Sequence, residues 1–216
     1  MCFSAAASFS AGTLLLAVGA VTLRMVQRSA QRPYAAIPLL FAVQQLVEGV
    51  VWLSFGGPAG LNFVATQVYS FFSHVLWPVY VPLAAWRMEP RGPRRRALSA
   101  FVAAGLVVGG YLLFSLVATP IRATPVGGHV EYQSPHFYAA ASMTLYLLST
   151  TVSLLLSSHA WVKLFGALAL ASSFVSYLFY ARWFISVWCF FAALLSAVVA
   201  LHFLARRSIS YQGIPS

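Results

Sequence analysis

The chain has 216 residues, of which 61% are hydrophobic and only 7% are charged. Soluble domains carry roughly a quarter charged residues because their surface faces water, so this composition excludes a soluble enzyme, a disordered protein and a coiled coil. The chain is expected to be an integral membrane protein. Its net charge of +10 is then expected to orient it in the bilayer, with no role in binding nucleic acid.

Seven stretches of the sequence are apolar enough to cross a bilayer, which takes about 20 residues in a helix. In chain order they are Ala5–Leu23, Tyr34–Phe55, Leu61–Trp86, Ala97–Val117, Phe137–Leu156, Val162–Tyr180 and Trp183–Leu204. The sequence therefore predicts an all-α fold, a bundle of seven transmembrane helices that forms one membrane domain over residues 1–216. Pro78 and Pro82 predict a kink or a tilt in the third stretch.

The basic residues predict the orientation of these spans. With the N-terminus outside, eleven of the 13 Lys and Arg residues fall on the inner side: Arg24, Arg28, Arg32, Arg87, Arg91, Arg94, Arg95, Arg96, Lys163, Arg206 and Arg207. Only Arg122 and Arg182 fall on the outer side. By the positive-inside rule this bias favours an outer N-terminus and an inner C-terminus. We expect a multi-pass protein of the bacterial cytoplasmic membrane.

The loops between the spans differ in character. The inner loop from Arg87 to Arg96 is polybasic and contains Pro90, Gly92 and Pro93. Such a loop is typical of contact with anionic lipid headgroups, here through Arg91, Arg94, Arg95 and Arg96. The longest outer segment runs from Pro120 to His136 and is expected to be a polar loop.

One span contains a carboxylate, which is expensive inside a membrane and usually functional. Glu48 follows Gln44 and Gln45, at spacings that put the three side chains largely on one helix face. This polar face is expected to point into the bundle.

The next span contains an interior histidine. Gln67, Ser70 and His74 again form one stripe, and Trp77-Pro78 follows directly. Because a short glycine-rich turn joins the two spans, Glu48 and His74 are predicted to face each other in the outer half of the bundle.

Cys2 is the third candidate, since an outer N-terminus places it at the outer mouth. A thiolate, an imidazole and a carboxylate are a plausible ligand set for zinc or another transition metal, with water or the N-terminal amine in the fourth position. The leading hypothesis is a metal site of Cys2, Glu48 and His74, supported by Gln44, Gln45, Ser70 and Trp77. The metal would activate water for hydrolysis or hydration of a small or lipidic substrate, with Glu48 as ligand or general base.

Other interpretations of the same residues stay open. Glu48 can instead stabilise the bundle through Gln44, a tyrosine or Arg182, and Cys2 can form a disulfide with Cys189. A small-molecule or ion transporter would use Glu48 as its coupling carboxylate and His74 as a relay. A non-catalytic subunit would use the whole bundle only for packing.

Three segments also resemble a known family. They are the opening Met-Cys-Phe-Ser, the run Gln44 to Gly49 with Trp52, and the run His74 to Pro78. Together they resemble a family of bacterial seven-span membrane proteins of about this length. The family brings no established activity, so the resemblance implies a site at these residues and leaves the chemistry open.

Overall fold

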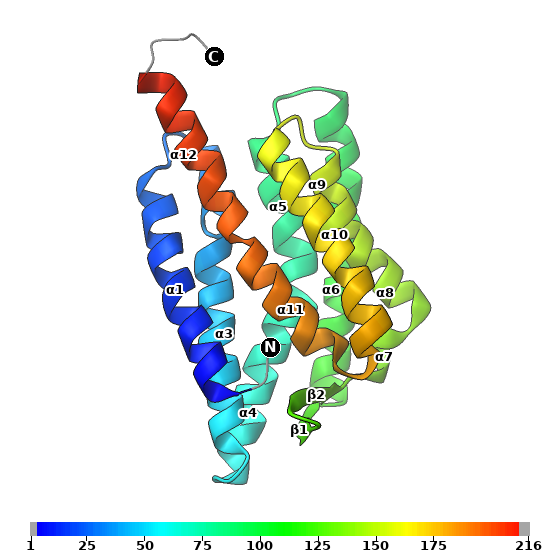
Figure 1. Cartoon of the computed structure of the whole chain (residues 1–216). Helices are drawn as coiled ribbons and strands as arrows, with labels where there is room; N and C mark the ends of the chain where they lie inside the picture. Colours follow the sequence, from blue (N-terminus) through cyan, green and yellow to red (C-terminus); the bar gives the residue numbers. More distant parts are fainter. Residues whose placement is uncertain (1–3, 212–216) are drawn as a thin grey trace.

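A computed structural model describes residues 4–211 of the chain, and helices dominate this part (Figure 1). The helices are α1 (Ala5–Arg24), α2 (Arg32–Ala35), α3 (Ile37–Ser54), α4 (Ala59–Ser70), α5 (Trp77–Met88), α6 (Pro93–Ala118), α7 (Pro135–Tyr138), α8 (Ala140–Leu147), α9 (Ser153–Leu155), α10 (Ala160–Tyr180), α11 (Phe184–Leu195) and α12 (Ala197–Tyr211). Short 3-10 segments are η1 (Ser29–Gln31) and η4 (Ala181–Trp183), and π-helical segments are η2 (Phe71–Leu76) and η3 (Leu148–Val152). Two strands complete the fold, β1 (Arg122–Val126) and β2 (His129–Gln133).

Several helices are long and apolar enough to cross a membrane. Among the described residues there are five such stretches, Ala5–Arg24, Ser29–Ser54, Gly60–Met88, Pro93–Ala118 and Ala160–Ala205, and a shorter apolar helix at Ala140–Leu155. The last long stretch turns back at η4, so that α10 and α11 lie side by side (Figure 1). The structure supports a multi-pass membrane protein, and the count of seven spans and their orientation stay predictions.

The outward faces of the helices are apolar, as expected for contact with lipid. Phe114, Val117, Leu178 and Phe179 are each more than 70% exposed. Inside the bundle, by contrast, polar side chains are buried together with aromatic ones. This inversion is typical of a membrane protein, because polar groups in hydrocarbon must find partners within the protein.

The third predicted span contains a π-helical segment just before its prolines; the kink or tilt expected from Pro78 and Pro82 stays a prediction. The π-helical segment η2 comes between α4 and α5, and the backbone N–H of Trp77 donates to the carbonyl oxygen of Phe72. Gly105 of α6 lies directly on this region: a Cβ atom added there would be only 1.9 Å from the carbonyl oxygen of Pro78. The missing side chain lets α6 approach closely, as small residues do between transmembrane helices.

The predicted polar loop between Pro120 and His136 contains a β-hairpin formed by β1 and β2. The fold is mostly helical, as predicted, and this small sheet is its departure from an all-α bundle among the described residues. β1 and β2 are antiparallel, and Val126 pairs with His129 across a two-residue turn. The turn residues Gly127 and Gly128 have φ values of 59° and 76°. Both lie in the left-handed region that tight hairpin turns require and that glycine adopts without strain.

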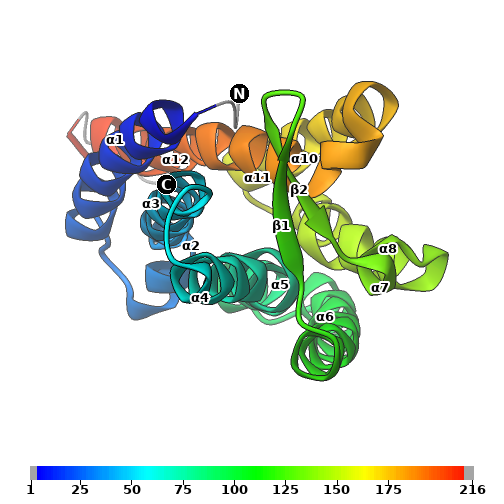
Figure 2. The ribbon, with the colours of Figure 1, turned by 90° about the horizontal axis from the view of Figure 1, so that it is seen from below.

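The hairpin lies across one end of the bundle, next to α4, α11 and η4 (Figure 2). Aromatic stacking holds it there, since Tyr132 stacks on Tyr69 at 4.5 Å and His129 stacks on Trp183 at 4.8 Å between ring centroids. Glu131 accepts two hydrogen bonds of 2.9 Å from Arg182. We call this end the hairpin end; the opposite end holds the turns after α1, α5 and α9 (Figure 1).

Candidate functional site

A pocket of about 350 Å³ opens beside the hairpin. It is lined by residues from η2, the end of α6, the connections on either side of the hairpin, the outer ends of β1 and β2, and the start of α7. These residues are His74, Leu112, Ser115, Leu116, Thr119, Pro120, Ile121, Arg122, Gln133, Ser134, Pro135 and His136. Ligand pockets in proteins typically have volumes of about 300–1,000 Å³, mostly apolar walls and a few converging polar groups. This pocket has those properties.

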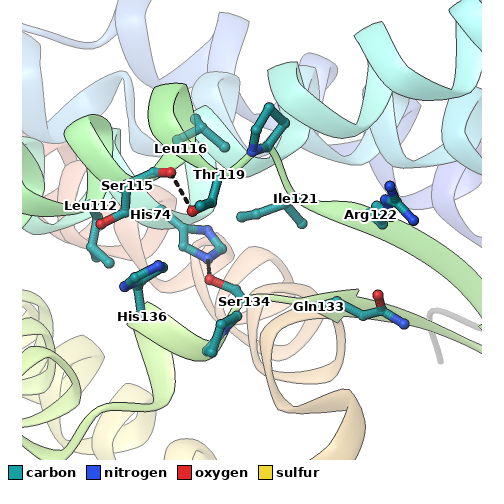
Figure 3. Close-up of a pocket in the computed structure, with 12 residues that line it drawn as sticks. His74, Leu112, Ser115, Leu116, Thr119, Ile121, Arg122, Gln133, Ser134 and His136 are labelled. Carbon is teal, nitrogen blue, oxygen red and sulfur yellow. Dashed lines mark hydrogen bonds between the residues drawn. The ribbon is translucent and has the colours of Figure 1, made fainter.

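His74 lies at the inner wall of the pocket and is only 1% exposed. Its Nε2 lies 2.9 Å from Ser134 Oγ, and its Nδ1 lies 2.8 Å from Ser73 Oγ. Figure 3 shows the ring directed at Ser134, with His136 on one side and Ile121 on the other. The imidazole of His74 therefore connects the hydroxyl of Ser134, which lines the pocket, with the buried hydroxyl of Ser73.

The hydrogen bonds of Ser73 are compatible with one tautomer of His74 that leaves Nε2 as an acceptor. Ser73 Oγ lies 3.3 Å from the carbonyl oxygen of Ser70 and 2.8 Å from Nδ1 of His74, and its single hydrogen can serve only one of these two atoms. When Ser73 donates to Ser70, Nδ1 is the protonated nitrogen and Nε2 holds the lone pair. In this tautomer the Ser134 hydroxyl donates to Nε2.

The surrounding residues hold the imidazole in this orientation. The hydroxyl of Tyr146 donates to the backbone carbonyl of Ser73 at 2.5 Å, which fixes η2 next to α8. The ring of Phe137 packs on the ring of His74, with centroids 4.9 Å apart. A serine that donates to a histidine, whose other nitrogen is fixed by a third group, is the arrangement that activates serine nucleophiles.

Ser134 was not among the residues that the sequence predicted. It follows β2 and precedes Pro135, at no fixed spacing from His74, which is 60 positions earlier in the chain. The hairpin brings it to the histidine, with Gln67 holding the linker: the side-chain amide of Gln67 donates to the carbonyl of Ile121 at 2.7 Å and accepts from its N–H at 3.3 Å. A serine has no sequence signal of its own, so only the fold could identify it.

Two charged groups border this region outside the spans. Arg122 lines the pocket and adds positive charge there. Arg182 is exposed, and its hydrogen bonds to Glu131 raise its pKa above the ordinary value. Burial lowers the pKa of His129 below its ordinary value, so this histidine is neutral at pH 7.

The second predicted cluster lies around Glu48, whose side chain is fully buried. Ser186 of α11 donates a hydrogen bond of 2.7 Å to Oε1 of Glu48. The indole N–H of Trp77 donates to Oε1 of Gln44, also at 2.7 Å. Arg182 pairs with Glu131 instead, so the alternative of a Glu48–Arg182 pair was wrong.

The other members of the polar face are buried in the same way. Gln44, Gln45 and Ser70 have no exposed surface, so the face points into the bundle as expected. Within the described residues, both amide atoms of Gln45 and Oγ of Ser70 have no hydrogen-bond partner. Cys189 is buried and has no disulfide partner within residues 4–211. Cys2, its partner in the disulfide alternative, lies outside that range, so this alternative stays a prediction.

The predicted metal ligands are only partly described. Cys2 lies outside residues 4–211, and within that range no group of three His, Cys, Asp or Glu side chains is arranged to hold a metal ion. Both ring nitrogens of His74 face serine hydroxyls, and Glu48 lies beside Ser186. The zinc site therefore stays a prediction.

These features define a helical membrane protein with a polar interior and a ligand-sized pocket at its hairpin end. The chain belongs to the family of unknown function DUF6629, whose family model matches residues 1–213. The match extends well beyond the three segments on which the sequence resemblance was based. No curated protein and no solved structure matches the chain.

Proposed function

We propose that the protein is a membrane-embedded serine hydrolase that cleaves an ester of a small or lipidic acyl group. The observation that carries this proposal is the 2.9 Å hydrogen bond between Ser134 and His74 at the wall of the 350 Å³ pocket. It differs from the metal-dependent hydrolase in its nucleophile, which is a serine hydroxyl, and in leaving Glu48 outside the reaction.

The reaction would proceed in two halves. Ser134 Oγ attacks the carbonyl carbon of the ester while its proton passes to Nε2 of His74. The C–O bond to the alcohol then breaks, and Nε2 returns the proton to the leaving alkoxide, which leaves an acyl group on Ser134. Water attacks this acyl group, gives a proton to Nε2 and releases the acid, after which the proton returns to Ser134.

The third group of this arrangement is a serine, Ser73, where many serine hydrolases have a carboxylate. A neutral hydroxyl orients the imidazole but stabilises the imidazolium less than a carboxylate does. Slow turnover is therefore expected.

The pocket walls indicate the class of ester. Leu112, Leu116 and Ile121 offer an apolar surface, and Arg122 lies at the same pocket. An amphiphilic ester fits this combination, with its acyl chain on the apolar wall and an anionic group near the guanidinium.

A fluorophosphonate, which reacts with activated serines, tests the proposal without knowledge of the substrate. Purified protein in detergent should form an adduct on Ser134, identified by peptide mass spectrometry, and Ser134→Ala should form none. Ser115→Ala is the matched control, because Ser115 lines the same pocket but donates its hydrogen to the backbone of Tyr111. Absence of an adduct on wild-type Ser134, with the fold intact, would overturn the proposal.

A second candidate, the transporter, is favoured by the Glu48 region. Glu48 is fully buried, and the amide of Gln45 on the same helix face is buried with no hydrogen-bond partner among the described residues. An unpaired amide inside a membrane protein is costly unless an ion, a water molecule or a substrate binds to it. In reconstituted vesicles, transport through this region requires that Glu48→Gln abolish flux while Ser134→Ala leaves it unchanged.

The zinc hypothesis has its own direct test, which is elemental analysis of wild type beside Cys2→Ala. About one equivalent of metal in the wild type, lost in the variant, would support it. Metal-free protein with an intact fold would remove it and leave the serine and transport proposals.

A further inference from the structure

A second pocket lies at the opposite end of the bundle, with a volume of about 380 Å³. It is formed where α5 turns into α6, and it is lined by Trp86, Arg91, Gly92, Arg95, Arg96 and Ser99. Three of these six residues are arginines, and none is acidic. The pocket is independent of the serine–histidine site, and nothing in the proposed function requires it.

One of the arginines is held in place by an aromatic ring. The guanidinium carbon of Arg95 lies 4.2 Å from the ring centroid of Trp86, and Arg95 is only partly exposed. Stacking uses the flat face of a guanidinium and leaves its N–H groups at the edge free to bind an oxyanion. A side chain ordered in advance loses less entropy when a ligand binds.

The nearest carboxylate in the sequence does not neutralise these arginines. Glu89 is buried, and it accepts hydrogen bonds from Ser157 Oγ at 3.2 Å and from the backbone N–H of Ser158 at 2.9 Å. Among the described residues, the one Arg–carboxylate ion pair joins Arg182 to Glu131 at the hairpin end. The three guanidinium groups of the pocket therefore keep their positive charge available.

The backbone adds to the same field. α6 begins at Pro93 and runs for 26 residues, so the positive end of its dipole is beside the pocket. The pocket also lies where two long apolar stretches meet, at the end of Gly60–Met88 and the start of Pro93–Ala118. Tryptophan and arginine are enriched at such positions, near the headgroups of a membrane.

We propose that this pocket is a built binding site for the phosphate group of an anionic membrane lipid. Arg91, Arg95 and Arg96 would donate hydrogen bonds to the phosphate oxygens, and Trp86 would hold Arg95 in the orientation that binds. This goes beyond the diffuse attraction expected of a polybasic loop, because it assigns different roles to neighbouring arginines.

Arg94 provides a matched control within the same helical turn. It is exposed and is not among the described residues that line the pocket. Arg94→Gln and Arg95→Gln give proteins of identical net charge. Diffuse attraction to an anionic surface would fall equally in the two variants, whereas a built site distinguishes them.

The experiment measures binding of short-chain phosphatidylglycerol to the full-length protein in uncharged detergent at about 0.15 M salt. Arg95→Gln is expected to weaken binding about tenfold, as for loss of charge-assisted hydrogen bonds, and Arg94→Gln less than about threefold. Trp86→Leu is expected to weaken binding about threefold by releasing Arg95. Thermal unfolding verifies that each variant is folded, and Arg91→Gln replaces Arg95→Gln if the latter does not fold.

Two results would overturn the proposal. Equal weakening by Arg94→Gln and Arg95→Gln would mean that the loop attracts lipid only through its net charge. Inorganic phosphate that binds as tightly as phosphatidylglycerol, and competes with it, would identify a site for the free ion instead of a lipid.

Discussion

The His74 region and the Glu48 region begin from the same sequence signal and end as two different environments. Both residues are ionisable groups within apolar spans, and the sequence predicted that they share one site. In the structure, His74 reaches a 350 Å³ pocket through Ser134, whereas Glu48 is fully buried beside Ser186 and is not among the residues that line that pocket. A polar residue in a span thus predicts burial inside the bundle, but it does not predict access to a ligand.

The largest expected effect separates the two regions by reactivity. His74→Gln should slow fluorophosphonate labelling of Ser134 by about 10²–10⁴-fold, because the serine loses its general base. Glu48→Gln should change the labelling rate less than about threefold, since Glu48 is outside the pocket. Rates are followed by intact-protein mass spectrometry.

Two results would contradict the separation of the His74 and Glu48 regions. If Glu48→Gln slows labelling as much as His74→Gln does, the two residues act as one site, as the sequence first predicted. Labelling that survives in His74→Gln would instead show that Ser134 reacts without the histidine.

The next effect concerns stability, where the order should reverse. Glu48→Ala removes a buried polar side chain, leaves Ser186 without its acceptor and opens a cavity, which together should cost about 2–4 kcal/mol. Ser134→Ala removes one hydroxyl beside an open pocket and should cost about 1 kcal/mol or less. Reversible unfolding in mixed micelles measures both.

Glu48→Gln is the control for this stability prediction, because it keeps the shape of the side chain and an acceptor for Ser186. It should be much less destabilising than Glu48→Ala. If the two variants lose the same free energy of unfolding, the bundle is stabilised by the carboxylate of Glu48 and not by the packing of its side chain.

Much of this architecture can be predicted from the sequence, because a run of apolar residues is enough to identify a helix that could span a membrane. The helix bounds lie close to the predicted spans, as for α1, which ends at Arg24 where Leu23 was expected. The buried polar face of Gln44, Gln45 and Glu48 was also predictable, since it depends on the spacing of neighbours within one helix.

The hairpin and the site it creates were harder to predict. The pair Gly127-Gly128 is a turn signal, but the polar composition around it predicts a loop and gives no strand pairing. The contact between Ser134 and His74 depends on how the hairpin docks against Tyr69 and Trp183. Such contacts arise from packing between distant segments, which single-sequence periodicity does not encode.

A smaller effect is expected when the hydrogen bonds between Gln67 and the pocket residue Ile121 are removed. Gln67→Leu removes both hydrogen bonds to Ile121 and leaves its backbone groups unpaired, a local cost of about 1–3 kcal/mol. Amide exchange should then accelerate in residues 119–134 and stay unchanged around Glu48. Faster exchange in both regions would show that they open together and would remove the distinction between them.

The smallest effect is a pH dependence confined to the hairpin. Burial lowers the pKa of His129, so the unfolded or undocked hairpin binds a proton more readily than the docked one. Docking is therefore fully stable above the ordinary histidine pKa of about 6.5 and weakens as the pH falls below it. Between pH 7.5 and 5.5, exchange of the hairpin amides, corrected for the intrinsic pH effect, should accelerate by less than about tenfold per pH unit.

His129→Gln is the control and should abolish this acceleration. The Glu48 region should show no acceleration in either protein, because the stacking of His129 on Trp183 of η4 holds only the hairpin end. A pH response that persists in His129→Gln would assign it to another group and would leave the stacking on Trp183 without a role in docking.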